Sequence, residues 1–558
     1  MSTATIATGV KTGAELLVES LEAQGVKHVF GIPGAKVDKV FDSLRDSSIE
    51  TIVCRHEQNA AFIAGGIGRM TGKAGVVLVT SGPGVTNLTT GLITATSEGD
   101  PLVAIGGAVG LENALKQVHQ SGDQVGLLRP VTKFSAEMDS PNSVAEVVAN
   151  AFRAAESGRP GAAYINARMN IMVGEANGDV LTPVAPESLG PANAQAIAVA
   201  ADLINRAQRP LLFLGMLASQ PGNAQAVREL LRKTRLPVVS TYQAAGVVSH
   251  DLADLFGGRV GLFHTQPADH LLDAADLVIT VGYDPIEYEP AQWNKGRKRN
   301  LIHVDGLRSD ADRDYHPQIE LTGDIAATLQ VLSGELKSRT LTSELAFLKE
   351  IARNREEFTK AAIAKTGMPV HPMRLVHELQ QLLTEDTTLC CDMGSFHIWL
   401  ARHLYSFRPR QVLITNGQQT LGVALPWGIA ACLVRPTEKV ISISGDGGFL
   451  FSAMELETAV RLKCNLVHIV WIDGSYDMVR FQAMAKYGRA SAVDFGPVDF
   501  VKYAEAFGAR GVQIENPDQI APSLKKALAT SGPVIVGIPV DYRENFRLAQ
   551  DLQPNAFF

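Results

Sequence analysis

The chain is long and mildly acidic. It has 558 residues, a hydrophobic content of 46% and a net charge of −7. That length exceeds what one hydrophobic core usually supports, so we expect several domains. No run approaches the roughly 20 apolar residues of a membrane helix, no secretory signal pattern opens the chain, and the charges give no basic face for nucleic acid. We therefore expect a cytoplasmic protein without membrane or nucleic-acid partners.

Short β-branched runs alternate with helical stretches in three groups. In chain order the runs are residues 26–32, 49–54, 74–80, 101–107, 209–215, 236–242, 276–282, 300–305, 439–445, 465–472 and 533–539. This alternation is typical of parallel sheets covered by helices. Stretches 174–193 and 336–368 lack such runs and separate the groups. We predict an α/β fold with three doubly wound parallel-sheet domains, over residues 12–178, 192–335 and 368–545.

A candidate metal site lies in one βαβ unit of the third group. Residues 439–444 predict a strand, residues 448–463 an amphipathic helix and residues 465–472 the next strand. Asp446 and Asp473 would then follow the carboxyl ends of two parallel strands, where open α/β sheets bind ligands. Two carboxylates side by side suit Mg²⁺, which keeps positions open for phosphate oxygens.

The glycines around the first aspartate support the same interpretation. Gly445, Gly447 and Gly448 let the backbone approach a diphosphate closely and expose N–H groups at a helix start. A GDGG sequence alone is also common in β-turns. The matching Asp473 after the next predicted strand favours the metal site over the turn.

Two other motifs do not carry the chemistry they suggest. GIGRMTGK (66–73) fails as a nucleotide-binding loop, because Ile67 occupies a required glycine position and Ala74 replaces the Ser or Thr that would hold Mg²⁺. RHEQNAAF lacks the second histidine of a zinc-binding HExxH motif, so His56 is interpreted as a structural histidine.

Many further segments follow one another in a fixed order along the chain; besides GDGGF, they include GIPGAKVDKVFDSL, TSGPGVTNL, KQVHQS, GYDPIEYEP, NGQQTLGVALPW and VDFGPVDFVKYAE. Together these segments resemble thiamine diphosphate (ThDP) enzymes, and among these the catabolic acetolactate synthases. The resemblance covers nearly the whole chain and implies a pyrimidine-binding, a central and a diphosphate-binding domain. It also implies ThDP and Mg²⁺ as cofactors, and a homodimer or homotetramer with active sites at the subunit interface.

The implied reaction condenses two pyruvates to 2-acetolactate with release of CO2, through a ThDP ylide and a hydroxyethyl-ThDP enamine. By resemblance Glu57 bonds the cofactor pyrimidine, Leu421 wedges between the cofactor rings, and Lys36 and Gln120 contact the substrate. Gln482 stands where FAD-containing biosynthetic relatives carry the tryptophan that selects 2-ketobutyrate. We therefore expect pyruvate as donor and acceptor, and FAD is not expected.

The other implied site residues are contacts to the cofactor and the metal. The cofactor contacts are Met393, Gly394, Ser395, Phe396, Gly417, Gln419, Gly445, Asp446, Gly447, Gly448 and Tyr476. The metal ligands are Asp446, Asp473 and the backbone carbonyl of Ser475. From the residues alone, Glu57 is also compatible with a carboxylate that stabilises a helix N-terminus, Leu421 with core packing and Lys36 with a solvated lysine.

Two places depart from the family pattern. Residues 167–170 read ARMN where the family has LPQD, and Gly122 stands in HQSGD where the family has HQSMD. Both bear on substrate fit and subunit packing. Three alternatives stay open: another ThDP-dependent decarboxylase, carboligase or pyruvate oxidase, a non-catalytic binding protein on a ThDP fold, and a nucleotide-dependent dehydrogenase without a complete fingerprint.

Overall fold

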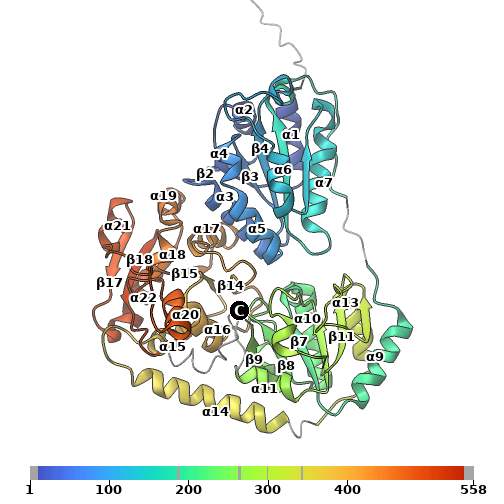
Figure 1. Cartoon of the computed structure of the whole chain (residues 1–558), viewed down its shortest axis with the longest axis vertical. Helices are drawn as coiled ribbons and strands as arrows, with labels where there is room; N and C mark the ends of the chain where they lie inside the picture. Colours follow the sequence, from blue (N-terminus) through green and yellow to red (C-terminus); the bar gives the residue numbers. More distant parts are fainter. Residues whose placement is uncertain (1–10, 185–188, 262–265, 298, 341–343, 546–558) are drawn as a thin grey trace, which may run out of the picture. The chain divides into compact units, whose positions relative to one another are not determined.

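The computed structural model contains three six-stranded sheets, each wholly parallel (Figure 1). It describes residues 11–184, 189–261, 266–297, 299–340 and 344–545. The chain divides into two compact units: residues 1–187 with 429–434 form the first, and residues 188–428 with 435–558 the second. The first unit holds one sheet and the second unit holds two, which confirms the predicted fold class of three parallel-sheet domains.

The first sheet has the strand order β2-β1-β3-β4-β6-β5. Its strands are β1 (His28–Ile32), β2 (Glu50–Val53), β3 (Gly75–Val79), β4 (Leu102–Ala108), β5 (Phe134–Glu137) and β6 (Ala162–Arg168). Its helices are α1 (Gly13–Ala23), α2 (Asp38–Leu44), α3 (Glu57–Thr71), α4 (Pro83–Thr86), α5 (Thr89–Glu98), α6 (Gln124–Leu128), α7 (Val144–Glu156) and α8 (Met169–Val173). Helices α1, α2, α7 and α8 share one core cluster with the sheet, and α3 packs against β3 and α5.

The second unit begins with the central sheet, of order β12-β11-β10-β7-β8-β9. Its strands are β7 (Pro210–Leu214), β8 (Val238–Thr241), β9 (Phe256–Val260), β10 (Leu277–Val281), β11 (Asn300–Asp305) and β12 (Ile319–Thr322). Its helices are α9 (Ala194–Arg206), α10 (Pro221–Thr234), α11 (Pro267–Ala274), α12 (Pro290–Trp293) and α13 (Ile325–Glu335), followed by the connecting helix α14 (Glu344–Ile363). Helices α9, α10 and α13 bury one face, and α11, α12 and α14 share a second core cluster.

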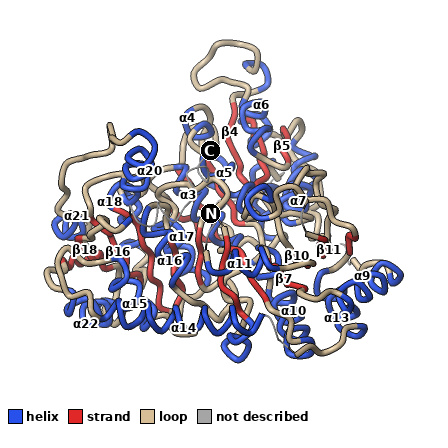
Figure 2. The backbone as a smooth tube through the Cα atoms, turned by 60° about the horizontal axis from the view of Figure 1, so that its bottom comes forward, coloured by secondary structure: helices blue, strands red, loops and turns tan. Residues whose placement is uncertain are grey.

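The third sheet has the order β14-β13-β15-β16-β18-β17. Its strands are β13 (Thr387–Cys391), β14 (Val412–Ile414), β15 (Lys439–Gly445), β16 (Leu466–Ile472), β17 (Arg510–Gln513) and β18 (Val534–Pro539). Its helices are α15 (Pro372–Leu382), α16 (Ser395–His403), α17 (Ala424–Val434), α18 (Asp446–Phe449), α19 (Leu456–Arg461), α20 (Asp477–Tyr487), α21 (Phe500–Ala506) and α22 (Ile520–Leu528). Helices α15, α16 and α22 bury one face, and Figure 2 shows helices on both sides of the strands.

The burial of the strands explains why the sequence pattern predicted them. Strands β3, β4, β7 and β10 are buried along their whole length. A parallel strand covered by helices on both faces needs apolar side chains at every position rather than at alternate ones. The continuous Val, Ile and Leu runs follow from that double coverage.

The predicted single helix over residues 448–463 is wrong. The chain instead forms the short helix α18, a 3-10 turn at Ala453–Glu455 and then α19. Phe449 is fully buried against His468, Phe500 and Tyr503, while Phe451 turns toward the backbone at Gly422. The backbone leaves the α-helical pattern here, because the N–H groups of Phe451 and Ser452 donate to the carbonyls three residues back and Ser452 has φ of −135°.

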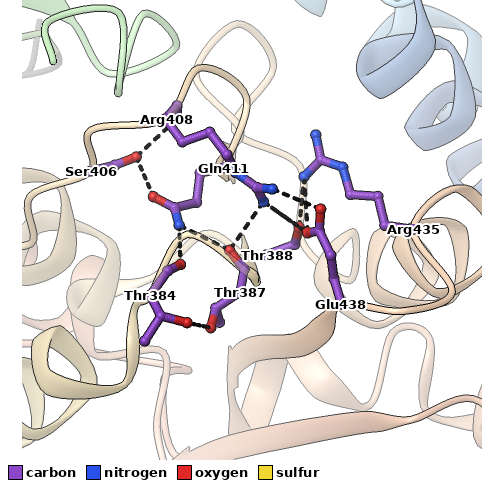
Figure 3. A network of polar contacts seen from close by, with 8 residues as sticks. All are labelled: Thr384, Thr387, Thr388, Ser406, Arg408, Gln411, Arg435 and Glu438. Carbon is purple, nitrogen blue, oxygen red and sulfur yellow. Dashed lines mark hydrogen bonds and ion pairs between the residues drawn. The ribbon is translucent and has the colours of Figure 1, made fainter.

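A polar network joins the strands of the third sheet at their amino-terminal edge (Figure 3). Glu438, just before β15, forms an ion pair with Arg408 at 2.7 Å and accepts a hydrogen bond from Thr388 of β13. Arg435 also donates to Thr388, at 2.6 Å. Gln411, just before β14, donates to the carbonyls of Thr384 and Thr387. The starts of three neighbouring strands are thus held together at the edge opposite their carboxyl ends.

None of the helices that the structure describes is both long enough and apolar enough to cross a membrane.

Candidate active site

Two predicted metal ligands follow neighbouring strands of the third sheet. Strands β15 and β16 pair in register up to Gly445, and Asp446 and Asp473 come directly after them. Asp446 accepts hydrogen bonds from the backbone N–H of Gly447 at 3.0 Å and of Gly474 at 2.8 Å. The second bond links the two strand ends, so both carboxylates lie on the carboxyl edge of the sheet, as the sequence predicted.

The electrostatics of this pair suit a cation. Burial raises the pKa of Asp446. Burial also raises the pKa of Asp473 to about 7; the hydrogen bond from Ser475 opposes this rise and the charge of Asp446 adds to it. A buried and a half-buried carboxylate that repel one another are stabilised by a divalent cation between them. In the described part of the chain no cluster of three or more His, Cys, Asp or Glu side chains could hold a metal, so further ligands would come from carbonyl or phosphate oxygens.

Asp392 is a buried carboxylate at this edge that sequence reasoning missed. It follows β13 and accepts hydrogen bonds from the backbone N–H of Met393, the backbone N–H of Gly422 and the hydroxyl of Ser444. Burial raises its pKa to about 7 against these donors. Asp392 therefore fixes the loop at Gly422 next to the ends of β13 and β15. A signal existed in the sequence, since an aspartate before Met-Gly at a strand end repeats the pattern of Asp446.

The predicted cofactor residues around the glycine loop come together. A Cβ atom at Gly448 would lie 3.2 Å from the Asp392 carboxylate and 3.6 Å from the Leu421 side chain. A Cβ at Gly447 would lie only 2.7 Å from the ring of Tyr476. Glycine is therefore needed at 447 for close packing. Leu421 lies beside the loop.

The start of helix α16 forms another side of this site. Gly394 precedes the helix, and Phe396 lies 3.5 Å from where a Cβ at Gly445 would be. Ser395 donates to Asp477 at 2.5 Å, and Asn545 donates to the same carboxylate oxygen at 2.6 Å. The first turns of α16 and α20 are thereby joined.

The remaining predicted residues of this unit lie on the adjoining segments. Gln419 has a left-handed backbone with φ of 51°, in the same loop as Gly417. Ser475 is buried, and its hydroxyl donates to Asp473. Gln482 is half-buried on α20. The 417–422 loop, the 473–476 turn and α20 therefore adjoin the carboxyl edge.

Glu57 lies in the first unit, at the start of α3. The residue is 9% exposed, and its carboxylate accepts a hydrogen bond from Asn87 at 2.9 Å. A Cβ at Gly84 would lie 3.6 Å from the other carboxylate oxygen. His56 caps the helix by accepting from the N–H of Gln58, which confirms its structural role. Glu57 is thus held at the start of α3 in one orientation by Asn87.

Lys36 and Gln120 lie on loops at the carboxyl edge of the first sheet. Lys36 is half-buried in the turn after β1, where its backbone carbonyl would lie 2.9 Å from a Cβ at Gly107. Gln120 has φ of 61° and accepts a hydrogen bond from Ser81 at 3.2 Å. Ser81 lies two residues after the end of β3, so both predicted substrate residues lie close to the ends of strands β1 and β3.

The segment that departs from the family pattern has its own contacts. Arg168 forms an ion pair with Glu137 and donates to the carbonyl of Val109 at 2.9 Å. Asn170 accepts from the N–H of Leu111 at 3.0 Å. The ARMN segment therefore holds the loop after β4 in place.

Comparison with known families gives three matches along the chain. Residues 11–127 match the model described as thiamine pyrophosphate enzyme, N-terminal TPP binding domain. Residues 197–332 match the central domain of the same enzymes, and residues 392–538 their C-terminal TPP binding domain. The chain belongs to the thiamine pyrophosphate enzyme family. Its cofactor is therefore ThDP, with Mg²⁺ as the usual metal of the family.

Comparison with curated relatives shows which members of this family the chain is similar to. The chain is 50% identical to the acetolactate synthase of Bacillus subtilis (strain 168), over 98% of this chain and 96% of the relative. It is 52% identical to the catabolic acetolactate synthase of Raoultella terrigena, over 96% of both chains. Identity to the large subunit of acetolactate synthase isozyme 2 of Escherichia coli (strain K12) is 32% over 96% of both chains. The predicted resemblance to catabolic acetolactate synthases is confirmed.

Proposed function

We propose that this enzyme joins two molecules of pyruvate into 2-acetolactate. One proton is taken up and one CO2 is released for each acetolactate formed. The observation that carries the proposal is the set of carboxylates at the carboxyl edge of the third sheet, Asp446 with Asp473, in a chain about half identical to named acetolactate synthases.

Glu57 is proposed to hold the proton that the cofactor exchanges. ThDP, when bound, supplies a carbon nucleophile that attacks the ketone carbon of pyruvate. The carboxyl group of Glu57 would bond a ring nitrogen of the pyrimidine and exchange a proton with it. Asn87 keeps the Glu57 carboxylate in one orientation by donating to it.

Asp446, Asp473 and the carbonyl of Ser475 are proposed to hold Mg²⁺. The N–H bonds from Gly447 and Gly474 orient Asp446, and the Ser475 hydroxyl orients Asp473. Gly445, Gly447 and Gly448 would let the diphosphate approach the backbone. Residues 393–396, Gly417, Gln419, Leu421 and Tyr476 would complete the contacts to the cofactor.

Lys36, Gln120 and Gln482 are proposed to select the substrate. The half-buried ammonium of Lys36 would attract the carboxylate of pyruvate, and the amide of Gln120 would donate to it. The amide of Gln482 on α20 would face the acceptor and leave no apolar surface for a longer ketoacid. FAD has no step in this reaction.

We further propose a cytoplasmic homodimer or homotetramer in which each active site uses Glu57 of one subunit and the Asp446 and Asp473 pair of another. The domain division at residues 12–178, 192–335 and 368–545 stays a prediction. Co-expression of the Glu57→Gln and Asp446→Ala chains tests the shared site. Mixed oligomers should regain activity, because one of their sites combines an intact Glu57 with an intact Asp446. Mixed oligomers that stay as inactive as either variant alone would contradict the shared site.

The function itself is tested by the carbon balance of the purified enzyme without added FAD. We expect one CO2 and one acetolactate for every two pyruvates consumed, with acetolactate measured as acetoin after acid treatment. Acetaldehyde in a one-to-one ratio with pyruvate would instead identify a decarboxylase. Peroxide or acetate formation would identify an oxidase.

A further inference from the structure

A small cavity in the second unit is lined by cations. Its volume is about 120 Å³, and it lies among β9, α11, α14 and the end of α16. The polar side chains that line it are Arg259, Arg355, Arg402, His403, Gln266, Asn354 and Tyr405. Within the described residues no aspartate or glutamate lines it. The cavity therefore collects three guanidinium groups without a lining carboxylate.

Two of these guanidinium groups have buried N–H donors that bond nothing within the described residues. Arg259 is only 7% exposed, and its Nη2 atom has no hydrogen-bond partner there. The Nε atom of Arg355 is also buried and has no hydrogen-bond partner among the described residues. The Arg355 guanidinium lies 3.6 Å from the centre of the Tyr405 ring, and that of Arg259 lies 5.9 Å from it. Stacking on the ring stabilises the charges, but it leaves those N–H groups without an acceptor.

The titration behaviour agrees with an excess of positive charge. Burial lowers the pKa of Arg259 to about 10, and the charge of Arg355 also lowers it. Burial lowers the pKa of His403 to about 3, with further lowering by the charges of Arg402 and Arg259. A buried cation without a counter-charge is costly, and a bound anion would remove that cost.

We infer that this cavity binds a small oxyanion, either inorganic phosphate or the carboxylate of a small acid. Guanidinium groups are planar forks of N–H donors that match the oxygens of both anions. A volume of about 120 Å³ is too small for a nucleotide, since sites for larger organic ligands measure roughly 300 to 1,000 Å³. The chemistry and the size together select a small oxyanion.

This site is separate from the proposed ThDP site, and α16 connects them. The helix begins at Ser395, beside the cofactor loop, and ends at His403, which lines the cavity. Nine residues of α-helix span about 13 Å. An anion in the cavity would join α14, β9 and α16, and would hold the helix whose first turn adjoins the cofactor site.

The test is thermal unfolding of the holoenzyme, with ThDP and Mg²⁺ present, in phosphate, in oxamate and in chloride at matched ionic strength. Oxamate is a small carboxylate shaped like pyruvate whose amide carbonyl resists attack. We expect at least one of the two oxyanions to raise Tm by several degrees in a saturable way, relative to chloride. A response to phosphate alone identifies phosphate as the ligand class, and a response to oxamate alone identifies the carboxylate.

Variants of the lining arginines distinguish binding in this cavity from effects of the anions elsewhere on the protein. Arg259→Met should remove the oxyanion response and should raise Tm in chloride, because it removes a buried charge that meets no carboxylate among the described lining residues. Arg355→Met gives a second variant if the first fails to fold. Arg353→Met is the matched control on the same helix, since Arg353 is exposed and pairs with Glu357; it should respond like the wild type.

Two results would overturn the inference. One is a Tm in phosphate and oxamate equal to that in chloride. The other is an Arg259→Met or Arg355→Met enzyme whose Tm still rises with the oxyanion as in the wild type. Neither result depends on acetolactate formation, so the oxyanion site can fail while the proposed function stands.

Discussion

The first and third sheets have the same topology but opposite chemistry at their carboxyl edges. Numbered within each sheet, the strand order is second, first, third, fourth, sixth, fifth in both. In such sheets the ligand crevice lies between the first and third strands, where the strand order reverses. Figure 1 shows one such sheet in the first unit and the other in the second.

The residues that follow these strands differ in charge. In the first sheet, Lys36 follows β1, and Ser81, bonded to Gln120, follows β3. In the third sheet, Asp392 follows β13 and Asp446 follows β15. A cation with neutral donors suits an organic anion, whereas buried carboxylates suit a metal ion. Topology therefore gives the place of a site, and the residues after the strands give its chemistry.

The largest expected effect concerns Glu57, at the carboxyl edge of the first sheet. Glu57→Gln keeps the shape of the side chain but cannot carry the proton, so we expect acetolactate formation to fall by about 10² to 10⁴. ThDP binding, measured by tryptophan fluorescence, should persist. Glu50→Gln is the matched control, because Glu50 is an exposed residue of β2, and it should keep full activity. Near-normal turnover by Glu57→Gln would remove Glu57 from the mechanism.

The next effect concerns the acids of the third sheet. Asp446→Ala removes one proposed metal ligand, and we expect the Mg²⁺-dependent affinity for ThDP to fall by at least about 10- to 100-fold. Titration of the apoenzyme with ThDP at fixed Mg²⁺ measures this. Asp518→Ala, at an exposed position of the same unit, should bind ThDP like the wild type. Unchanged affinity in Asp446→Ala would place the metal elsewhere.

The opposite edge of the third sheet should affect stability and not chemistry. Glu438→Ala leaves the partly buried Arg408 and Arg435 without their carboxylate, and we expect a loss of about 2 to 3 kcal/mol in the free energy of unfolding. Denaturant unfolding measures the loss. Glu457→Ala breaks only the exposed pair with Arg461 and should cost less than about 1 kcal/mol. A lower kcat of the Glu438→Ala enzyme under conditions where it is fully folded would contradict the claim that this edge contributes to stability and not to catalysis.

The central sheet provides a test that depends on pH. Glu287 is buried at its carboxyl edge and accepts hydrogen bonds from Met216, Thr241 and Asp284. Burial raises its pKa to about 8. The folded chain therefore holds this proton up to about pH 8, whereas a carboxyl in the unfolded chain releases it near 4.5.

The sign of the effect follows from that difference. Between those two pH values the folded state binds more protons, so the contribution of Glu287 to stability is complete below about pH 4.5 and is lost as pH rises toward 8. The slope is at most about 1.4 kcal/mol per pH unit for one proton. Glu287→Gln should flatten the decline, measured as unfolding free energy against pH. An unchanged slope would mean that another group causes it.

The smallest effect is expected at Gly122, where the chain departs from the family pattern. A Cβ at this exposed position would meet nothing within 4 Å. Gly122→Met should change the free energy of unfolding by less than about 0.5 kcal/mol. A clear change in KM for pyruvate with unchanged stability would show that the departure affects substrate fit.

The sequence predicted correctly those features that depend on residues close together in the chain. The long apolar runs became strands because both faces of each sheet are covered, and Asp446 and Asp473 each follow such a run directly. Strands β5, β9, β12, β13, β14 and β17 had no predicted run; of these, β13 (Thr387–Cys391) carries two cysteines and β14 (Val412–Ile414) is only three residues long. A run of three residues, or one of mixed polarity, is too short or too irregular to be recognised as a strand from its hydrophobic pattern.

The rest depended on contacts between distant parts of the chain. Asp392 gains its role from the N–H of Gly422, 30 residues away, and no spacing in the sequence fixes that bond. The cationic cavity likewise needs Arg259 of β9 and Arg355 of α14 to meet around Tyr405. The helix predicted over residues 448–463 is interrupted where Phe449 packs against Phe500 and Tyr503, which are distant in the sequence.

The most direct test of the account is the rate of acetolactate formation from pyruvate as ThDP is added, with Mg²⁺ present or removed by a chelator. We predict saturable acetolactate formation with both cofactors, loss of activity after chelation, and recovery when Mg²⁺ is returned. Acetolactate formed at an equal rate without Mg²⁺, or no acetolactate with both cofactors present, would contradict the assignment of the third sheet's carboxylates and of the reaction.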